Sequence, residues 1–298
     1  MDETTYAAIT PARNEADNLP RVAESLAGQT APPARWLIVD NGSTDATATV
    51  ARALSEHHGW AQLLSVPGDD APVRGAPIVR ALHAGIEALV AEGHPSFVVS
   101  IDADISFAPD YFERLLAKFA QDARLGIASG TCYELEGDAW RQRHVTGSTV
   151  WGASRMYRWT CLEEVLPLEE RFAWDGIDEI KANARGWRTT TFVDLPFRHH
   201  RPEGVRDESQ FRARASQGRA AHYMGYRPWY IALRGMRHML REPAALGLIW
   251  GYAAAELSGA ERCPDVAARA YLRSQQSIRR LPRRVRETLA HRRTMPTS

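Results

Sequence analysis

The segment of residues 36–47, WLIVDNGSTDAT, constrains the fold most, because a short apolar run delivers the carboxylate of Asp40 into a turn of small polar residues. Apolar runs at residues 6–10 and 97–101 lead into similar polar turns. Each run is predicted to be a buried strand that ends near one or two acids: Glu15, Asp40, Asp102 and Asp104. Ligands of open α/β sheets bind at the carboxyl ends of the strands. The three strand ends therefore predict a site for a nucleotide and a metal ion.

The segments between these runs carry apolar residues at helical spacing. One predicted helix is expected to place four residues on a single side, Leu82, Ile86, Leu89 and Val90. The alternation of strand and helix predicts an α/β protein with a doubly wound, Rossmann-like, mostly parallel sheet and helices on both faces. After residue 207 only helical candidates remain. We predict a core domain of residues 1–205 and a C-terminal helical extension, residues 206–298, packed on that core.

The composition indicates the setting of the protein. The formal net charge of +1 argues against a nucleic-acid partner, although the tail of residues 273–293 is rich in arginine. The three cysteines, Cys132, Cys161 and Cys263, are widely spaced and odd in number, so neither a disulfide framework nor a thiolate zinc site is predicted. The first residues do not resemble a secretory signal, and we expect a cytoplasmic location.

The most apolar segment is residues 244–257, AALGLIWGYAAAEL, which is shorter than the roughly 20 residues that a membrane-spanning helix needs. Two alternatives remain open for it. It is either a helix packed on the rest of the protein or an interfacial helix, flanked by basic residues, that rests peripherally on the inner face of an anionic membrane.

Three segments, taken in order, resemble the family 2 glycosyltransferases of the GT-A fold. They are ITPARNEADNLPRVAESLAGQT at residues 9–30, WLIVDNGSTDAT at residues 36–47, and SIDADI at residues 100–105. The resemblance covers residues 6 to about 204. It implies an enzyme that moves a sugar from a nucleotide-diphosphate donor to an acceptor hydroxyl with inversion, and that uses Mg²⁺ or Mn²⁺ as its cofactor.

The resemblance also implies which residues surround the donor: Pro11, Arg13, Glu15, Asp40, Asn41, Arg74 and Asp102. Glu15 and Asp40 could instead cap helices. Asp102 and Asp104 would reach the ribose and a cation that bridges the two phosphates, since hard cations prefer carboxylate oxygens. One of two adjacent histidines, His199 or His200, would complete the metal site, because alternate side chains of an extended chain face opposite ways. The arginines Arg198 and Arg201 could clamp the diphosphate.

The general base of the family is matched by FAWDGIDEIKANARGW, residues 172–187. The resemblance implies that Asp175 takes the proton of the acceptor hydroxyl, with Trp174 in place of the usual glutamate and Asp178 as the reserve. Asp175 could also cap a helix expected over residues 176–185. The acceptor and sugar pocket is implied to include Trp151, Gly152 and Trp174, and an aromatic face there would suit a sugar ring.

Two other functions stay open at this point, a sugar-1-phosphate nucleotidyltransferase and a non-catalytic nucleotide-sugar binding protein. The first should show a glycine-rich loop with a lysine near its N-terminus, and the second would tolerate loss of Asp175. No Gln-x-x-Arg-Trp segment occurs in the sequence, which favours a single transfer over a processive synthase. The acceptor is expected to be a glycan, a lipid-linked intermediate or a small molecule.

Overall fold

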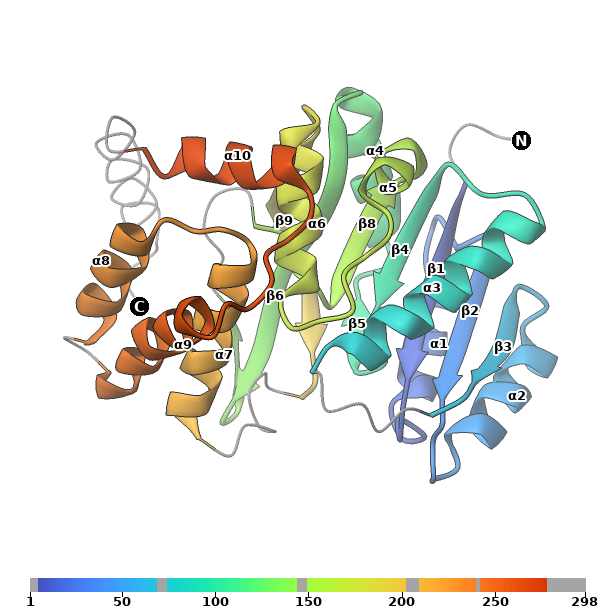
Figure 1. Ribbon diagram of the computed structural model, residues 1–298. Coiled ribbons are helices and arrows are strands. Elements are labelled where there is room, and N and C mark those ends of the chain that lie inside the picture. The colour runs from blue at the N-terminus through green and yellow to red at the C-terminus, as the bar shows by residue number, and fades with distance from the viewer. Residues whose placement is uncertain (1–4, 69–73, 144–148, 202–208, 240–241, 278–298) are drawn as a thin grey trace. The chain divides into compact units, whose positions relative to one another are not determined.

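The computed structural model describes residues 5–68, 74–143, 149–201, 209–239 and 242–277. The chain divides into two compact units, Met1–Pro202 and Glu203–Ser298. Figure 1 shows that the first unit combines strands with helices, whereas the described part of the second is helical.

The first unit is built on a nine-stranded sheet with the order β3-β2-β1-β4-β8-β6-β9-β5, in which β7 pairs with β6. Its strands are β1 Tyr6–Ala12, β2 Arg35–Asn41, β3 Ala61–Val66, β4 Phe97–Ile101, β5 Ile105–Phe107, β6 Leu125–Glu136, β7 Ala139–Gln142, β8 Ser154–Arg158 and β9 Arg188–His199. The pairs from β3 to β4 are parallel, while β8 runs antiparallel to β4 and β6, and β6 pairs in parallel with β9. The predicted α/β class is confirmed, and the sheet is mixed beyond β4.

Helices cover both faces of this sheet (Figure 1). They are α1 Leu19–Ala27, α2 Thr47–His57, α3 Ala76–Ala91, α4 Tyr111–Gln121, α5 Trp159–Val165 and α6 Trp174–Ala184. Because strand side chains alternate between faces, Ile38 of β2 packs in the core with α1, α2 and α4, whereas Leu37 and Val39 pack in the second core with α3, α5 and α6. An apolar run buried on both faces is typical of a central parallel strand.

Some local features differ from the sequence prediction. Strands β5, β7 and β8 lack a long apolar run and were not predicted. Val90, expected on the buried side of α3, is 56% exposed because the helix turns that position outward near its end. Helix α6 begins at Trp174, two residues earlier than expected, after Ala173 in the left-handed conformation. Asp175 therefore lies inside the first turn and is not the N-cap.

The second unit contains α7 Gln210–Tyr223, α8 Pro228–Met239, the short 3₁₀ helix η1 Pro243–Ala245, α9 Leu246–Leu257 and α10 Val266–Gln275. Helices α7 and α9 pack with their backbones in contact. A Cβ atom added to Gly218 would lie 2.2 Å from the carbonyl oxygen of Leu248, and one added to Gly251 would lie 2.0 Å from that of Ala215. Among the described residues, every helix is too short or too polar to span a bilayer.

Candidate functional site

The loops that follow β1 and β2 are tied to each other by hydrogen bonds. Asn14 adopts a left-handed backbone conformation, and its side-chain oxygen accepts from the backbone N–H of Thr44 at 2.8 Å. Its own N–H donates to the hydroxyl of Ser43 at 3.0 Å. The N–H of Glu15 donates to the hydroxyl of Thr47 at 2.8 Å. The two loops predicted to surround the nucleobase therefore form one rigid edge of the sheet.

The side chains predicted to bind the nucleotide occupy different positions on this edge. Asp40 is 7% exposed, and its Oδ1 accepts from the N–H of Ser43 at 3.2 Å, so it shapes the turn and does not cap α2. Asn41 donates from Nδ2 to the carbonyl oxygen of Pro77 at 3.1 Å and links the turn to α3. Pro11 is half-buried and Arg13 is exposed.

Asp102, Asp104 and His199 converge at the next strand ends. Their nearest ligand atoms lie within 4.8 Å of one another. The Oδ1 atom of Asp104 lies 3.1 Å from Nε2 of His199, and both residues are buried. The backbone explains this convergence, because His199 ends β9 opposite Ile105, the first residue of β5. Two carboxylates and one imidazole form a ligand set that suits Mn²⁺ or Mg²⁺.

His200 points elsewhere, although its backbone N–H donates to the carbonyl oxygen of Asp104 at 2.8 Å. Its Nε2 lies 2.8 Å from the hydroxyl of Ser106, and its ring packs edge-on against Trp140. The structure thus places His199 with the acids and His200 outside that group, a choice that the sequence left open.

The buried carboxylate of Glu134 lies on the Nδ1 side of the His199 ring. The Nδ1 atom of His199 faces Oε1 of Glu134 at 3.7 Å, and Glu134 is itself paired with Arg143 at 2.9 Å. Burial lowers the pKa of His199, but hydrogen bonds with Asp104 and Cys132 and the charges of Asp104 and Asp102 raise it to about 11 overall. A carboxylate on the far side of a ligating histidine orients the ring and raises its basicity. Glu134, which the sequence analysis missed, lies within electrostatic range of the ring, although Nδ1 of His199 has no hydrogen-bond partner among the described residues.

Arg201 links the first loop to the acids of the third. Its Nη2 lies 2.7 Å from Oδ2 of Asp104 and 2.5 Å from Oε1 of Glu15. The other carboxylate oxygen of Glu15 accepts from Nδ2 of Asn18 at 2.7 Å. One guanidinium group thus balances two acids that would otherwise repel each other.

The two acids of α6 face different surroundings. Asp178 is 2% exposed and lies 2.6 Å from Nη2 of the fully buried Arg155, and it also accepts from the hydroxyl of Tyr157. Asp175 is half-buried on another side of the helix, where a Cβ atom added to Gly152 would lie 3.0 Å from its Oδ2. Asp178 is therefore part of a buried ion pair, whereas the carboxylate of Asp175 lies next to Gly152.

The remaining predicted residues have mixed positions. Trp151 is half-buried, and its Nε1 is enclosed without a hydrogen-bond partner in the part of the chain that the structure describes. Trp174 is 7% exposed and packs in the core with α3 and α5, and its role in the acceptor pocket stays a prediction. Arg74 lies over the ring of Phe172, directly before α6.

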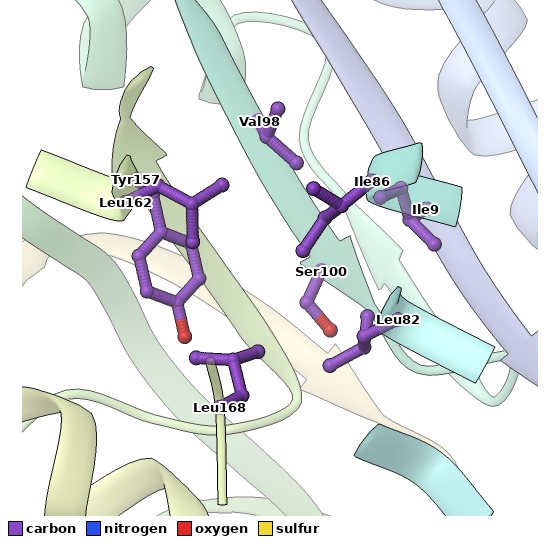
Figure 2. Close-up of a pocket in the computed structure, with 8 residues that line it drawn as sticks. All are labelled: Ile9, Leu82, Ile86, Val98, Ser100, Tyr157, Leu162 and Leu168. Carbon is purple, nitrogen blue, oxygen red and sulfur yellow. The ribbon is translucent and has the colours of Figure 1, made fainter. Parts of the chain in front are cut away.

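A small cavity of about 10 Å³ lies in the second core, and the candidate metal ligands Asp102, Asp104 and His199 do not line it. Figure 2 shows the side chains that line it, Ile9, Leu82, Ile86, Val98, Ser100, Tyr157, Leu162 and Leu168. This volume is close to the minimum for one water molecule, so it is a packing defect and not a sugar pocket.

The sequence model of the family described as Glycosyl transferase family 2 matches residues 7–166, which is more than half of the chain. The chain therefore belongs to glycosyl transferase family 2, and it is a glycosyltransferase. Among solved structures it resembles the mannosyltransferase PcManGT from Pyrobaculum calidifontis in complex with GDP-Man and Mn²⁺. That match has a TM-score of 0.57 and 19% identity, and it covers 95% of this chain and 83% of that one.

A second similar structure is TarS 1–349 of S. aureus in complex with UDP. It matches with a TM-score of 0.54 and 14% identity over 85% of this chain and 92% of that one. The same TarS fragment has also been solved with UDP-GlcNAc. These likenesses confirm the GT-A fold that the sequence predicted.

The guanidinium of Arg155 lies among three acids of α6. Its Nη2 contacts Asp178 and Glu179 and also donates to the carbonyl oxygen of Asp175. Burial raises the pKa of Asp178 to about 6 and that of Glu179 to about 8, although Arg155 acts in the opposite direction on both. Burial therefore favours the protonated form of Glu179 in the folded protein.

We predict that Glu179 makes the stability of the protein depend on pH. Its folded-state pKa of about 8 lies above the ordinary value of 4.5, so the folded protein holds the extra proton between those values. The free energy of unfolding should then fall as the pH rises through this window, by at most about 1.4 kcal/mol per pH unit. Glu179→Gln should reduce this slope in urea unfolding measured from pH 5 to 9, while the part that comes from other groups with raised pKa values, such as His199, remains.

The exposed acid Glu136 supplies the matched control, and Glu136→Gln should keep the slope of the wild type. Parallel plots of unfolding free energy against pH for the wild type and Glu179→Gln would show that Glu179 is ionised from pH 5 to 9. That result would contradict the prediction.

Proposed function

We propose that this glycosyltransferase moves a sugar from a nucleotide-diphosphate donor to an acceptor hydroxyl with inversion, once per encounter, and requires a divalent cation. The observation that carries the proposal is the convergence of Asp102, Asp104 and His199 at the sheet edge that also holds Asp40. A nucleoside diphosphate needs both features, a polar edge for the base and ribose and a cation site for its phosphates.

Asp102, Asp104 and His199 would hold the cation, and Glu134 would orient the histidine. A bound Mg²⁺ or Mn²⁺ supplies charge that stabilises the departing diphosphate. The chemistry of this donor set supports the assignment, because hard cations favour oxygen ligands and Mn²⁺ also accepts imidazole. The similar mannosyltransferase was solved with Mn²⁺ and GDP-Man, which supports both a metal and a nucleotide sugar for this chain.

Asp175 is our proposed general base. It takes the proton of the acceptor hydroxyl as that oxygen attacks the anomeric carbon from the side opposite the nucleoside diphosphate, so one displacement inverts the configuration. Asp178 is unsuited to this role because Arg155 and Tyr157 occupy its carboxylate. Gly152 fits the proposal, since a larger residue would press on the Asp175 carboxylate.

The acceptor belongs to a glycan, a lipid-linked intermediate or a small molecule in the cytoplasm. The lack of a Gln-x-x-Arg-Trp segment in the sequence supports a single transfer. Membership of a glycosyltransferase family favours sugar transfer over the nucleotidyl transfer that the sequence first left open.

We expect one class of nucleotide sugar to raise the melting temperature of the protein, and Mn²⁺ to increase that shift. A ligand that binds only the folded state stabilises it by mass action. The measurement is thermal unfolding with UDP-, GDP- and dTDP-sugars, with and without Mn²⁺. Asp104→Ala should lose the Mn²⁺-dependent part, whereas Asp138→Ala, at an exposed turn, should keep it. Folded protein that responds to none of these donors would refute the proposed function.

The two acids of α6 should respond differently to the same isosteric change. Asp175→Asn should lower the release of nucleoside diphosphate from the donor by about 10²-fold or more, with little effect on unfolding, because it removes the base. Asp178→Asn should instead lower the free energy of unfolding by about 3 kcal/mol, because it breaks a buried ion pair. Full turnover in a folded Asp175→Asn enzyme would reject Asp175 as the base.

Arg201 should compete with the cation for Asp104. Arg201→Gln removes two ion pairs worth up to about 1 kcal/mol each, so Mn²⁺ should bind between about 2-fold and 30-fold more tightly. Free Mn²⁺ measured by electron paramagnetic resonance gives this affinity without any turnover. Arg201→Lys should stay near the wild type, and Arg198→Gln should have no effect because Arg198 lies over Trp140. Unchanged or weaker binding by Arg201→Gln would contradict the competition.

A further inference from the structure

The two units carry opposite charge. Residues 203–298 contain 18 arginines, no lysine and 8 acidic residues, a formal charge of +10, whereas residues 1–202 contain 19 basic and 28 acidic residues, a charge of −9. The net charge of +1 for the whole chain hides this separation. A unit of such positive charge attracts polyanionic surfaces over about a Debye length, roughly 8 Å at physiological salt.

Helix α9 has apolar residues on its outer face as well as its inner one. Leu246, Trp250 and Leu257 are 48%, 63% and 89% exposed, and their spacing of four and seven residues aligns them on one side. Leu248 and Tyr252 lie on the opposite side and are buried. Glu256 is the one charged residue of the helix. The outer stripe runs the length of α9 without a charge in it.

Helix α8 repeats this arrangement beside α9 (Figure 1). Leu233 and Met236 are 46% and 50% exposed, and they face away from the buried positions Ile231 and Gly235. The exposed Arg237 lies next to this stripe on the helical wheel. A single exposed leucine is ordinary, but aligned stripes on two neighbouring helices form the kind of surface that marks an interaction site.

In the described part of the second unit, residues 209–239 and 242–277, 9 arginines stand against 4 acidic residues, and this positive charge selects the partner. A second copy of the same surface would bring two strongly positive units together, which is unfavourable. A nucleic acid would satisfy the arginines but not the apolar stripes. An anionic bilayer offers phosphate groups to the arginines and a place for leucine, methionine and tryptophan at the acyl boundary. Helices of 12 residues are also too short to span it.

We propose that the C-terminal unit docks on an anionic membrane surface through the outer stripes of α8 and α9, Leu233, Met236, Leu246, Trp250 and Leu257. This docking does not depend on the proposed transfer reaction. If both hold, the enzyme works at a surface where lipid-linked acceptors are concentrated.

The test is flotation of the full-length protein with vesicles of phosphatidylcholine alone, or of phosphatidylcholine with 30% phosphatidylglycerol. We expect binding to the anionic vesicles only, and weaker binding in high salt. Trp250→Glu and Leu233→Glu should each lower the partition coefficient by about tenfold, because each loses apolar contact and adds a repelled charge. Trp250→Leu should keep most of the binding.

Ser274→Glu, at an exposed position on α10, makes the same charge change outside the stripes and should reduce binding less than either stripe variant. Melting temperatures establish that each variant is folded. The proposal is overturned if folded wild type ignores anionic vesicles, or if Ser274→Glu and Trp250→Glu weaken binding equally. Concentration-dependent self-association that Trp250→Glu abolishes, without vesicle binding, would instead identify the stripes as an interface between copies.

Discussion

The buried guanidinium of Arg155 forms the contacts on which the position of α6, and with it the proposed base Asp175, depends. It donates to Asp178 and Glu179 of α6, to the carbonyl oxygen of Asp175, and to that of Val150. Strand β8 is thereby fixed to α6 and to the segment around Val150 that precedes β8. Since each guanidinium nitrogen of Arg155 donates inside the protein, the group is costly to disturb and holds the first turn of α6 in place. The proposed base sits on that turn.

The residues proposed to bind the donor depend on a different interaction, in which acidic side chains pair with cationic side chains of the same chain. Glu15 and Asp104 come from separate strand ends and are bridged by Arg201, while His199 joins Asp104 to Glu134. The positive groups at this site prevent its acids from repelling one another. A cation of higher charge can replace the guanidinium, so the same residues would serve the protein with and without its ligand.

The two units differ in charge and in exposed apolar surface. The acidic first unit contains the strand ends and the candidate metal ligands, whereas the arginine-rich second unit carries the outer stripes of α8 and α9. Glycines at the contact of α7 and α9 let two backbones touch, so that small residues hold these helices together and larger apolar residues remain for the outer face.

The sequence by itself determined the α/β class, the family, and the strand-end motifs with Asp40, Asp102 and Asp104, because each depends on residues close together in the chain. Only the tertiary structure separated Asp175 from Asp178 and His199 from His200. Those choices depend on partners far along the chain: Arg155 lies 23 residues from Asp178, and Asp104 lies 95 residues from His199. The packing of Trp174 was likewise visible only in the fold, since its core neighbours come from α3 and α5. Local sequence patterns determine which functional groups a turn contains. The register of β8 and β9 determines which side chains from distant parts of the chain contact those groups.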